Sequence, residues 1–309
     1  MRPVFQSVLA SAFLAMASVA NAGPFEDGQA AYDRHDYATA LQVWQALADH
    51  GDAKAQNKLG NLFAAGQGVP KDYAEALKWY RLAADQSYAN AEANLAAAYE
   101  TGRGVSQDYA EAAKWCRKAA DQGFAAAQVH LAAMYHQGLG VPQNDAEAVK
   151  WVRLAADQGI GIAQAELGSM YANGQGVPQD YAEASKWMRL AADKGFAPAQ
   201  GALGFFFAQG QGVPQDYAEA LRWLHKAADQ GYAVAQFNLG VMYSNGKGVP
   251  KDDVHAYMWL SLAAAKSVLN ASEYRDDMLR EMNSIQVAEA QRLAHEWRPE
   301  GTWQPSRHS

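Results

Sequence analysis

Apolar residues recur with helical spacing along most of the chain. In residues 233–243, for example, Ala235, Leu239 and Tyr243 stand four positions apart and so share one face of a helix. Gly246 follows and is expected to end that helix. A second run of apolar positions comes after a short glycine-rich stretch. The pattern therefore predicts pairs of amphipathic helices.

The second helix of each pair has its own start and stop signals. It opens on Asp-Tyr-Ala-Glu at residues 72–75, 108–111, 180–183 and 216–219. Asp72 is expected to accept hydrogen bonds from the free amides of the first turn, and Glu75 to return one to the cap residue. A glycine such as Gly123 is expected to close the helix in the left-handed conformation. Glu75 and Lys78 stand three positions apart, which favours a solvated charged face.

A repeat of 36 residues organises most of the sequence. One column of the repeat holds tryptophan at residues 79, 115, 151, 187, 223 and 259, and another holds a Gly-Val pair beginning at residues 68, 104, 140, 176, 212 and 248. A fixed period of 20 to 50 residues predicts a solenoid of stacked units, none of which can bury its apolar face alone. The tryptophans should therefore serve the stack. Glycines such as Gly240, next to Leu239, mark places where helices cross closely.

The segment from Ala197 to Trp223 reads A-x-A-Q-x-x-L-G, then a Gly-rich turn with G-V-P, and then D-Y-A-E-A-x-x-W. This pattern resembles the Sel1-like repeat, a relative of the tetratricopeptide repeat. The resemblance implies an all-α fold, a right-handed α-solenoid of stacked helix-turn-helix repeats. Six repeats cover residues 53–267, after a degenerate tetratricopeptide-like N-terminal cap at residues 23–52. Capping helices are expected within 268–298, from Ser272 to Met282 and from Ile285 to Trp297, before a tail at 299–309.

The first 22 residues have the three parts of a secretory signal peptide. Arg2 is followed by an apolar run from Val8 to Ala20 and by Ala-Asn-Ala, which predicts cleavage after Ala22. The run is shorter than the roughly 20 residues of a membrane-spanning helix, so an uncleaved anchor is the weaker alternative. A periplasmic or secreted location follows. With one cysteine in the whole chain, no intramolecular disulfide can hold this exported fold.

Net charge and the absence of catalytic motifs narrow the function. A formal charge of -7 does not attract nucleic acid or an anionic membrane surface. His130 and His136 are six positions apart, which does not fit a zinc motif. Cys116 occupies an apolar column and is interpreted as a buried side chain rather than a nucleophile. We expect no enzyme activity, no cofactor and no metal, and a monomer without a membrane span.

Specificity should lie at positions that differ between repeats. In tetratricopeptide-like folds the first helix of each unit lines the concave face, and the resemblance therefore implies a groove for a partner protein or peptide. The candidate partner-binding residues are Val129, His136, Ser169, Asn173, Phe205, Phe237, Val241 and Asn245. The aromatic members near the C-terminal end are typical anchors for an apolar partner. Alternatively, these phenylalanines pack against the neighbouring repeat.

Two functions fit the resemblance. The first is an exported protein-protein interaction scaffold or adaptor, of the kind that regulates envelope signalling or supports cell-wall or polysaccharide assembly. The alternative is a β-lactam-binding protein, a weak β-lactamase or a cell-wall hydrolase of the same repeat family. For that alternative, Ser244 and Lys247 formally match S-x-x-K, but they lie in the turn after a helix, and neither S-D-N nor K-T-G accompanies them. The scaffold is the preferred hypothesis.

Overall fold

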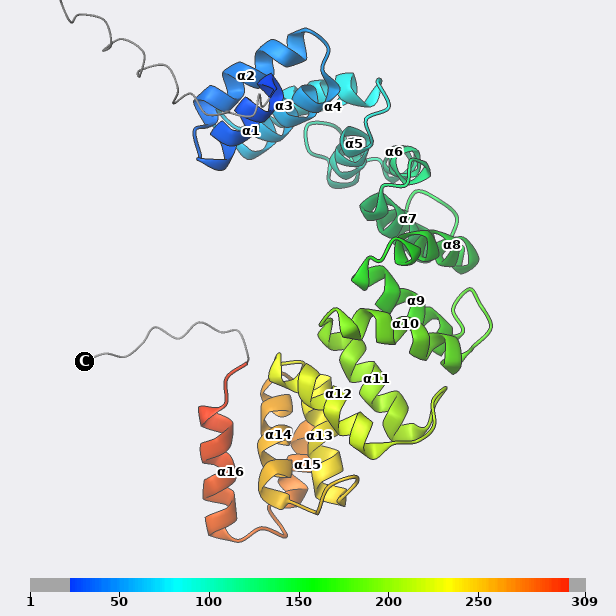
Figure 1. Ribbon diagram of the computed structural model, residues 1–309, viewed down its shortest axis with the longest axis vertical. Coiled ribbons are helices and arrows are strands. Elements are labelled where there is room, and N and C mark those ends of the chain that lie inside the picture. Colours follow the sequence, from blue (N-terminus) through cyan, green and yellow to red (C-terminus); the bar gives the residue numbers. More distant parts are fainter. Residues whose placement is uncertain (1–22, 300–309) are drawn as a thin grey trace, which may run out of the picture. The chain divides into compact units, whose positions relative to one another are not determined.

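The structure is a computed structural model that describes residues 23–299, and these residues fold into helices joined by short loops (Figure 1). The expected signal peptide, and the tail beyond Pro299, lie outside the described residues. The helices are α1 (Pro24–Asp33), α2 (Tyr37–Asp49), α3 (Ala53–Ala65), α4 (Tyr73–Ala84), α5 (Ala89–Thr101), α6 (Tyr109–Asp121), α7 (Ala125–Gln137), α8 (Asp145–Asp157), α9 (Gly161–Asn173), α10 (Tyr181–Asp193), α11 (Ala197–Gln209), α12 (Tyr217–Asp229), α13 (Ala233–Asn245), α14 (Asp253–Ala265), α15 (Ala271–Met278) and α16 (Ser284–Glu296).

The predicted all-helical repeat fold is confirmed. From α3 to α14 each 36-residue repeat contributes one antiparallel pair, and within each compact unit neighbouring pairs stack as in an α-solenoid. The chain divides into two compact units, and the division falls within α7. Among the described residues, unit 1 comprises 23–127 together with 139–141, and unit 2 comprises 128–138 together with 142–299. Each unit has its own core, and each is described by itself below.

The aspartate caps form as predicted, but the glutamates do not return the bond. Asp72 Oδ1 accepts from the backbone N–H groups of Ala74 at 2.9 Å and Glu75 at 3.0 Å. The carboxylate of Glu75 instead receives Lys78 Nζ at 2.6 Å. The capping box expected at Asp-Tyr-Ala-Glu is therefore wrong, because the glutamate side chain turns along the helix toward a cation. Such an exposed pair adds only a few tenths of a kcal/mol.

Small residues set the spacing between the two helices of a repeat. A Cβ atom placed on Gly204 of α11 would come within 2.7 Å of Leu224 Cγ on α12, and one on Gly240 of α13 within 2.6 Å of Leu260 Cγ on α14. These distances are inside van der Waals contact, so any side chain at these positions would push the helices apart. The close crossings inferred from the Leu-Gly pairs are confirmed.

The glycine of each Gly-Val pair joins one repeat to the repeat before it. In unit 2, Gly212 lies in the turn between α11 and α12 with φ of +68°, and a Cβ atom there would overlap the backbone carbonyl of Tyr181, the first residue of α10. The same relation holds 36 residues earlier between Gly176 and Asp145. Each turn thus sits directly on the start of the second helix of the preceding repeat.

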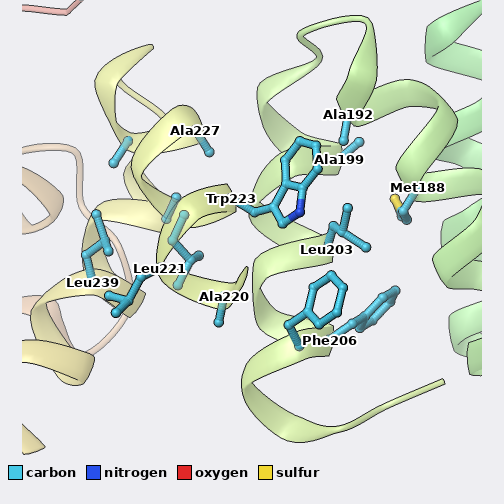
Figure 2. Close-up of a cluster of buried hydrophobic side chains, with 14 of the residues drawn as sticks. Met188, Ala192, Ala199, Leu203, Phe206, Ala220, Leu221, Trp223, Ala227 and Leu239 are labelled. Carbon is cyan, nitrogen blue, oxygen red and sulfur yellow. The ribbon is translucent and has the colours of Figure 1, made fainter. Parts of the chain in front are cut away.

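Tryptophan and aliphatic side chains fill the space between the helix layers of unit 2. Trp223 extends from α12 toward Leu203 and Ala199 of α11 (Figure 2), and it is only 2% exposed. Trp151 and Trp259 are also buried, whereas the tryptophans at 79, 115 and 187 are half-buried. The structural interpretation of the tryptophan column therefore holds most strongly in repeats 3, 5 and 6.

A buried glutamine that sequence reasoning did not single out links each repeat in unit 2 to the helix before it. Gln236 of α13 is fully buried and donates from Nε2 to the backbone carbonyl of Ala228, near the end of α12, at 3.2 Å. Gln200 of α11 makes the same bond to Ala192 at 3.1 Å. The last carbonyls of a helix have no intrahelical partner. The glutamine supplies one.

Helices outside the repeats pack against the first repeat in unit 1 and against the last repeat in unit 2. At the N-terminal end, Trp44 of α2 is fully buried against Phe25 and Tyr32 of α1. At the other end, α15 ends at Met278, so the helix predicted to run from Ser272 to Met282 is shorter than expected and starts one residue earlier. The next helix, α16, begins after Asn283, which forms a true capping box with Gln286.

Candidate functional site

An apolar groove of about 370 Å³ opens on the surface of unit 2. It lies between the first helices of repeats 5 and 6, α11 and α13, and it is closed at its edges by the residue before α13 and by the loop after α14. Its lining residues are Pro198, Gly201, Ala202, Phe205, Phe206, Tyr232, Val234, Phe237, Asn238, Val268 and Leu269. None of these side chains carries a charge, so the groove suits an apolar ligand group.

Three large apolar side chains of this apolar groove are open to solvent. Phe205 is 41% exposed, Val234 45% and Leu269 82%. Phe205 differs in this from its neighbours Phe206 and Phe207, which are 5% and 8% exposed because they point into the core of unit 2. Phe205 is therefore not enclosed in the core of unit 2, whereas Phe206 and Phe207 are.

The floor of the apolar groove is shaped by a glycine and by two ordered aromatic rings. A Cβ atom on Gly201 would lie 2.7 Å from Tyr232 Cε1, so only glycine lets the Tyr232 ring lie against α11. Burial of Tyr232 raises the pKa of its hydroxyl. Phe237 is half-buried, and its ring meets that of Tyr274 of α15 edge-on at 5.4 Å. Phe237 thus joins the groove to the C-terminal cap.

Only Phe205 and Phe237 of the eight candidate residues line the apolar groove. Two of the others share α13 with Phe237: Val241 is half-buried one turn farther along, and its backbone carbonyl receives Asn245 Nδ2 at 2.8 Å. Asn245 is the last residue of the helix. Neither contributes to the lining, because the groove occupies the N-terminal half of α13 and not its C-terminal end.

The remaining four candidates lie on α7 and α9. Asn173 ends α9 and donates to Ser169 Oγ at 3.4 Å. His136 Nδ1 is 2.7 Å from Asp145 Oδ1, an interaction between the end of α7 and the start of α8. Val129 is half-buried on α7. The polar side chains among these four bond to residues close to them in the sequence. None of the four lines the groove that contains Phe205.

Nine of the eleven lining residues stand outside the set of candidates. Tyr232, Val268 and Leu269 belong to the loops between helices, and most of the others lie one position from the helix face that carries Phe205 and Phe237. The groove forms where a loop meets two helices, so counting along the first helix alone finds only part of it. The spacing of 36 residues between Tyr232 and Val268 was the available signal.

Ser244 and Cys116, the two side chains considered as nucleophiles, are each bonded to a backbone carbonyl. Ser244 donates from Oγ to the backbone carbonyl of Val241 at 3.0 Å, as a helix residue bonded to its own helix. Cys116 is buried, and its Sγ lies 3.3 Å from the carbonyl oxygen of Ala127. Burial raises the pKa of this thiol to about 12.

Two kinds of feature are absent from residues 23–299. Over that range, the side chains of histidine, cysteine, aspartate and glutamate do not gather in groups of three or more that could hold a metal ion. None of the helices in that range is long and apolar enough to cross a membrane.

Comparison with known proteins places this architecture among the Sel1 repeats. The model of the Sel1 repeat matches six consecutive segments, residues 53–88, 89–124, 125–160, 161–196, 197–232 and 233–268. A Sel1 repeat protein from Oxalobacter formigenes has a crystal structure that matches with 34% identity and a TM-score of 0.73, over 78% of this chain and 99% of that one. No curated protein matches the sequence.

Two other crystal structures match with lower scores. A protective antigen of uropathogenic Escherichia coli strains, which displays an SLR fold, is 27% identical over 89% of this chain and 83% of its own, with a TM-score of 0.49. An immunity protein, Pa5087 of Pseudomonas aeruginosa, is 22% identical over 69% of this chain and 81% of its own, with a TM-score of 0.38.

Proposed function

The chain belongs to the Sel1 repeat family, and we propose that it is a non-enzymatic scaffold that binds an apolar segment of a partner protein in the apolar groove of unit 2. The observation that carries the proposal is the exposure of Phe205, Val234 and Leu269 around one uncharged hollow. Soluble proteins rarely keep contiguous apolar surface open to water unless it binds something. Complete burial of one such side chain contributes roughly 1.5 to 3 kcal/mol.

The shape of the groove favours a short segment with one or two apolar anchors. Its volume of about 370 Å³ is at the low end of the range for ligand pockets, roughly 300 to 1,000 Å³. Asn238 is the one lining residue with a polar side chain other than the Tyr232 hydroxyl, and it can fix the position of a backbone amide. An apolar helix face or a peptide carrying an aromatic anchor meets both requirements.

We further propose that the scaffold acts outside the cytoplasm. The proposal is supported by the charged start, the apolar run and the Ala-Asn-Ala of residues 1–22. Expression of the full chain followed by N-terminal sequencing of the exported protein should give a first residue of Gly23. A protein that keeps Met1, or that stays in the cytoplasmic fraction, would contradict export.

Photo-crosslinking tests the groove directly. A photoreactive phenylalanine analogue at Leu269 should give a discrete adduct in cells, and the same analogue at Leu190 should not. Leu190 is the matched control because it is 46% exposed on α10 and lies outside the groove lining. Phe205→Ala should then remove the Leu269 adduct. If the adduct survives Phe205→Ala, or appears equally at Leu190, the groove is not the binding site.

Stability measurements separate binding from folding. Phe205→Ala should cost only about 1 to 2 kcal/mol, since the side chain is already 41% exposed, whereas Phe207→Ala on the same helix should cost roughly 3 to 5 kcal/mol because Phe207 is buried. The reverse pattern, a large loss for Phe205→Ala together with an intact adduct, would make Phe205 a structural residue.

A further inference from the structure

A second groove, in unit 1, occupies the same place in the repeat as the apolar groove. It has a volume of about 360 Å³ and lies between α3 and α5, the first helices of repeats 1 and 2. Each residue that lines it has its counterpart four repeats later in the lining of the apolar groove; Asn61, for example, corresponds to Phe205 and Asn94 to Asn238. We call it the asparagine groove.

The two grooves share a backbone but differ in chemistry. Asn57 stands where the apolar groove has Gly201, Asn61 where it has Phe205, and Asn90 where it has Val234. Because the helix pairs stack in the same way at both places, stacking alone does not require asparagine at these positions. The carboxamides therefore need another explanation.

Hydrogen bonds within the asparagine groove orient its amides. Asn94 Nδ2 donates to Asn57 Oδ1 at 2.8 Å and to Asn61 Oδ1 at 3.3 Å, and the Tyr80 hydroxyl donates to Asn61 Oδ1 at 2.9 Å. Burial raises the pKa of Tyr80 to about 12, which keeps that donor protonated. The oxygens of Asn57 and Asn61 are thus committed. Their Nδ2 groups remain as donors, and Asn94 Oδ1 remains as an acceptor, among the residues that the structure describes.

Two aromatic rings and one cation complete the walls. Tyr88 and Phe124 line the asparagine groove as the paired equivalents of Tyr232 and Val268, and the Tyr88 hydroxyl accepts from Asn90 Nδ2 at 3.0 Å, which holds the ring in place. Lys58 is the one charged residue of the lining, and its ammonium group lies 5.4 Å from the ring centre of Trp44. The lining contains no carboxylate, so the groove presents amides and ring faces to its ligand.

From this arrangement we propose that the asparagine groove binds a neutral saccharide of one or two rings. Each sugar hydroxyl both donates and accepts, and the oriented donors of Asn57 and Asn61 beside the acceptor of Asn94 match adjacent hydroxyls. The C–H face of a pyranose ring packs on an aromatic face such as Tyr88 or Phe124. An apolar side chain of a peptide fits less well, because it would desolvate these amides without giving them hydrogen-bond partners.

Nuclear magnetic resonance on the ¹⁵N-labelled chain from Gly23 to Ser309 tests the proposal. The probes are cellobiose, maltose and N,N′-diacetylchitobiose, with penta-alanine amide as a peptide probe. At least one disaccharide should shift the side-chain amide signals of Asn57, Asn61 and Asn94 in a saturable way. Asn94→Ala should weaken that binding at least tenfold, and Asn238→Ala, its counterpart in the apolar groove, should not change it.

A second variant guards against a simple folding defect. Within the described part of the chain, the Asn90 side chain bonds to Tyr88 and lies outside the network of Asn57, Asn61 and Asn94, so Asn90→Ala should keep the melting temperature and still weaken disaccharide binding several-fold. The proposal is overturned if none of the three disaccharides shifts these signals, if binding is unchanged in both variants, or if only penta-alanine amide produces the shifts. In the last case the asparagine groove is a peptide site.

Discussion

Replacement of Gly212 by alanine tests the way in which one repeat is joined to the next. Gly212 has φ of +68°, and its turn rests on the backbone of Tyr181 at the start of α10. An alanine there must adopt a left-handed conformation and must also place a methyl group where the Tyr181 carbonyl already lies. Gly195, also in unit 2, is the matched control: its φ is +85°, and no atom lies within 4 Å of a Cβ placed on it.

The two substitutions should differ by the cost of the overlap alone. A left-handed alanine costs roughly 1 to 2 kcal/mol, of which about 0.4 to 1 kcal/mol is offset because alanine restricts the unfolded chain. Gly195→Ala should therefore destabilise the protein by about 1 kcal/mol. Forcing a methyl group into a filled space adds about 1 to 3 kcal/mol, since the turn has to move off α10. Gly212→Ala should then cost about 2 to 4 kcal/mol.

Urea unfolding followed by circular dichroism at 222 nm provides the measurement. Stacked repeats can unfold in parts, so hydrogen exchange at the amides of α10 and α11 should accompany it. Gly212→Ala should speed exchange at the start of α10, and Gly195→Ala should not. If the two variants unfold at the same urea concentration and leave the same exchange pattern, the turn is not packed on the preceding repeat and the explanation of the Gly-Val column fails.

Three further perturbations follow from burial. Cys116, with its pKa raised to about 12 by burial, should resist a disulfide reagent at pH 8 until the chain is unfolded, and rapid labelling of the native protein would contradict its position in the core. Burial lowers the pKa of His225. The charge of Asp229 raises this pKa and that of His255 lowers it further, and the net shift is downward. The unfolded chain therefore binds the proton more readily, so stability should fall as pH drops below about 6.5. Melting temperatures at pH 7.5 and 5.5 should show this loss, and it should shrink in His225→Gln. Trp223→Ala should cost roughly 3 to 5 kcal/mol in urea unfolding, because the ring is 2% exposed.

The helices were predictable because the same helix-start and helix-end residues recur in most repeats. Asp72 and Gly246 mark helix ends in the sequence, and both cap their helices in the structure. The failure at Glu75 is of a different kind. The Glu75 carboxylate can bond either to the backbone N–H of the cap residue or to Lys78, and both partners lie within one turn of it. The residue pattern is compatible with both contacts, so it cannot tell which one forms.

The apolar groove was predictable in part. Phe205 stood out because the other repeats have smaller or polar residues at its position, and Phe237 for a similar reason. Leu269 did not stand out, since it lies where the repeat pattern stops and reaches the groove through a loop. The buried Gln236 shows a different limit of prediction from sequence. Its position in the repeat is plain from the sequence, but only the three-dimensional structure shows that its side chain bonds to the end of α12.

The difference between fully buried and partly exposed positions of the first helix explains how two grooves of unlike chemistry can exist on one fold. The leucine of each first helix is fully buried, as at Leu59 between the asparagines of repeat 1 and at Leu203 between Gly201 and Phe205 of repeat 5. Positions two residues before and two residues after that leucine line the groove, as Asn57 and Asn61 do. Packing constrains the leucine. Asn61 and Phe205, which follow the leucine, keep one side toward solvent, so substitutions at that position change the ligand chemistry at little cost to the stack, whereas Asn57 and Gly201, which precede it, are buried.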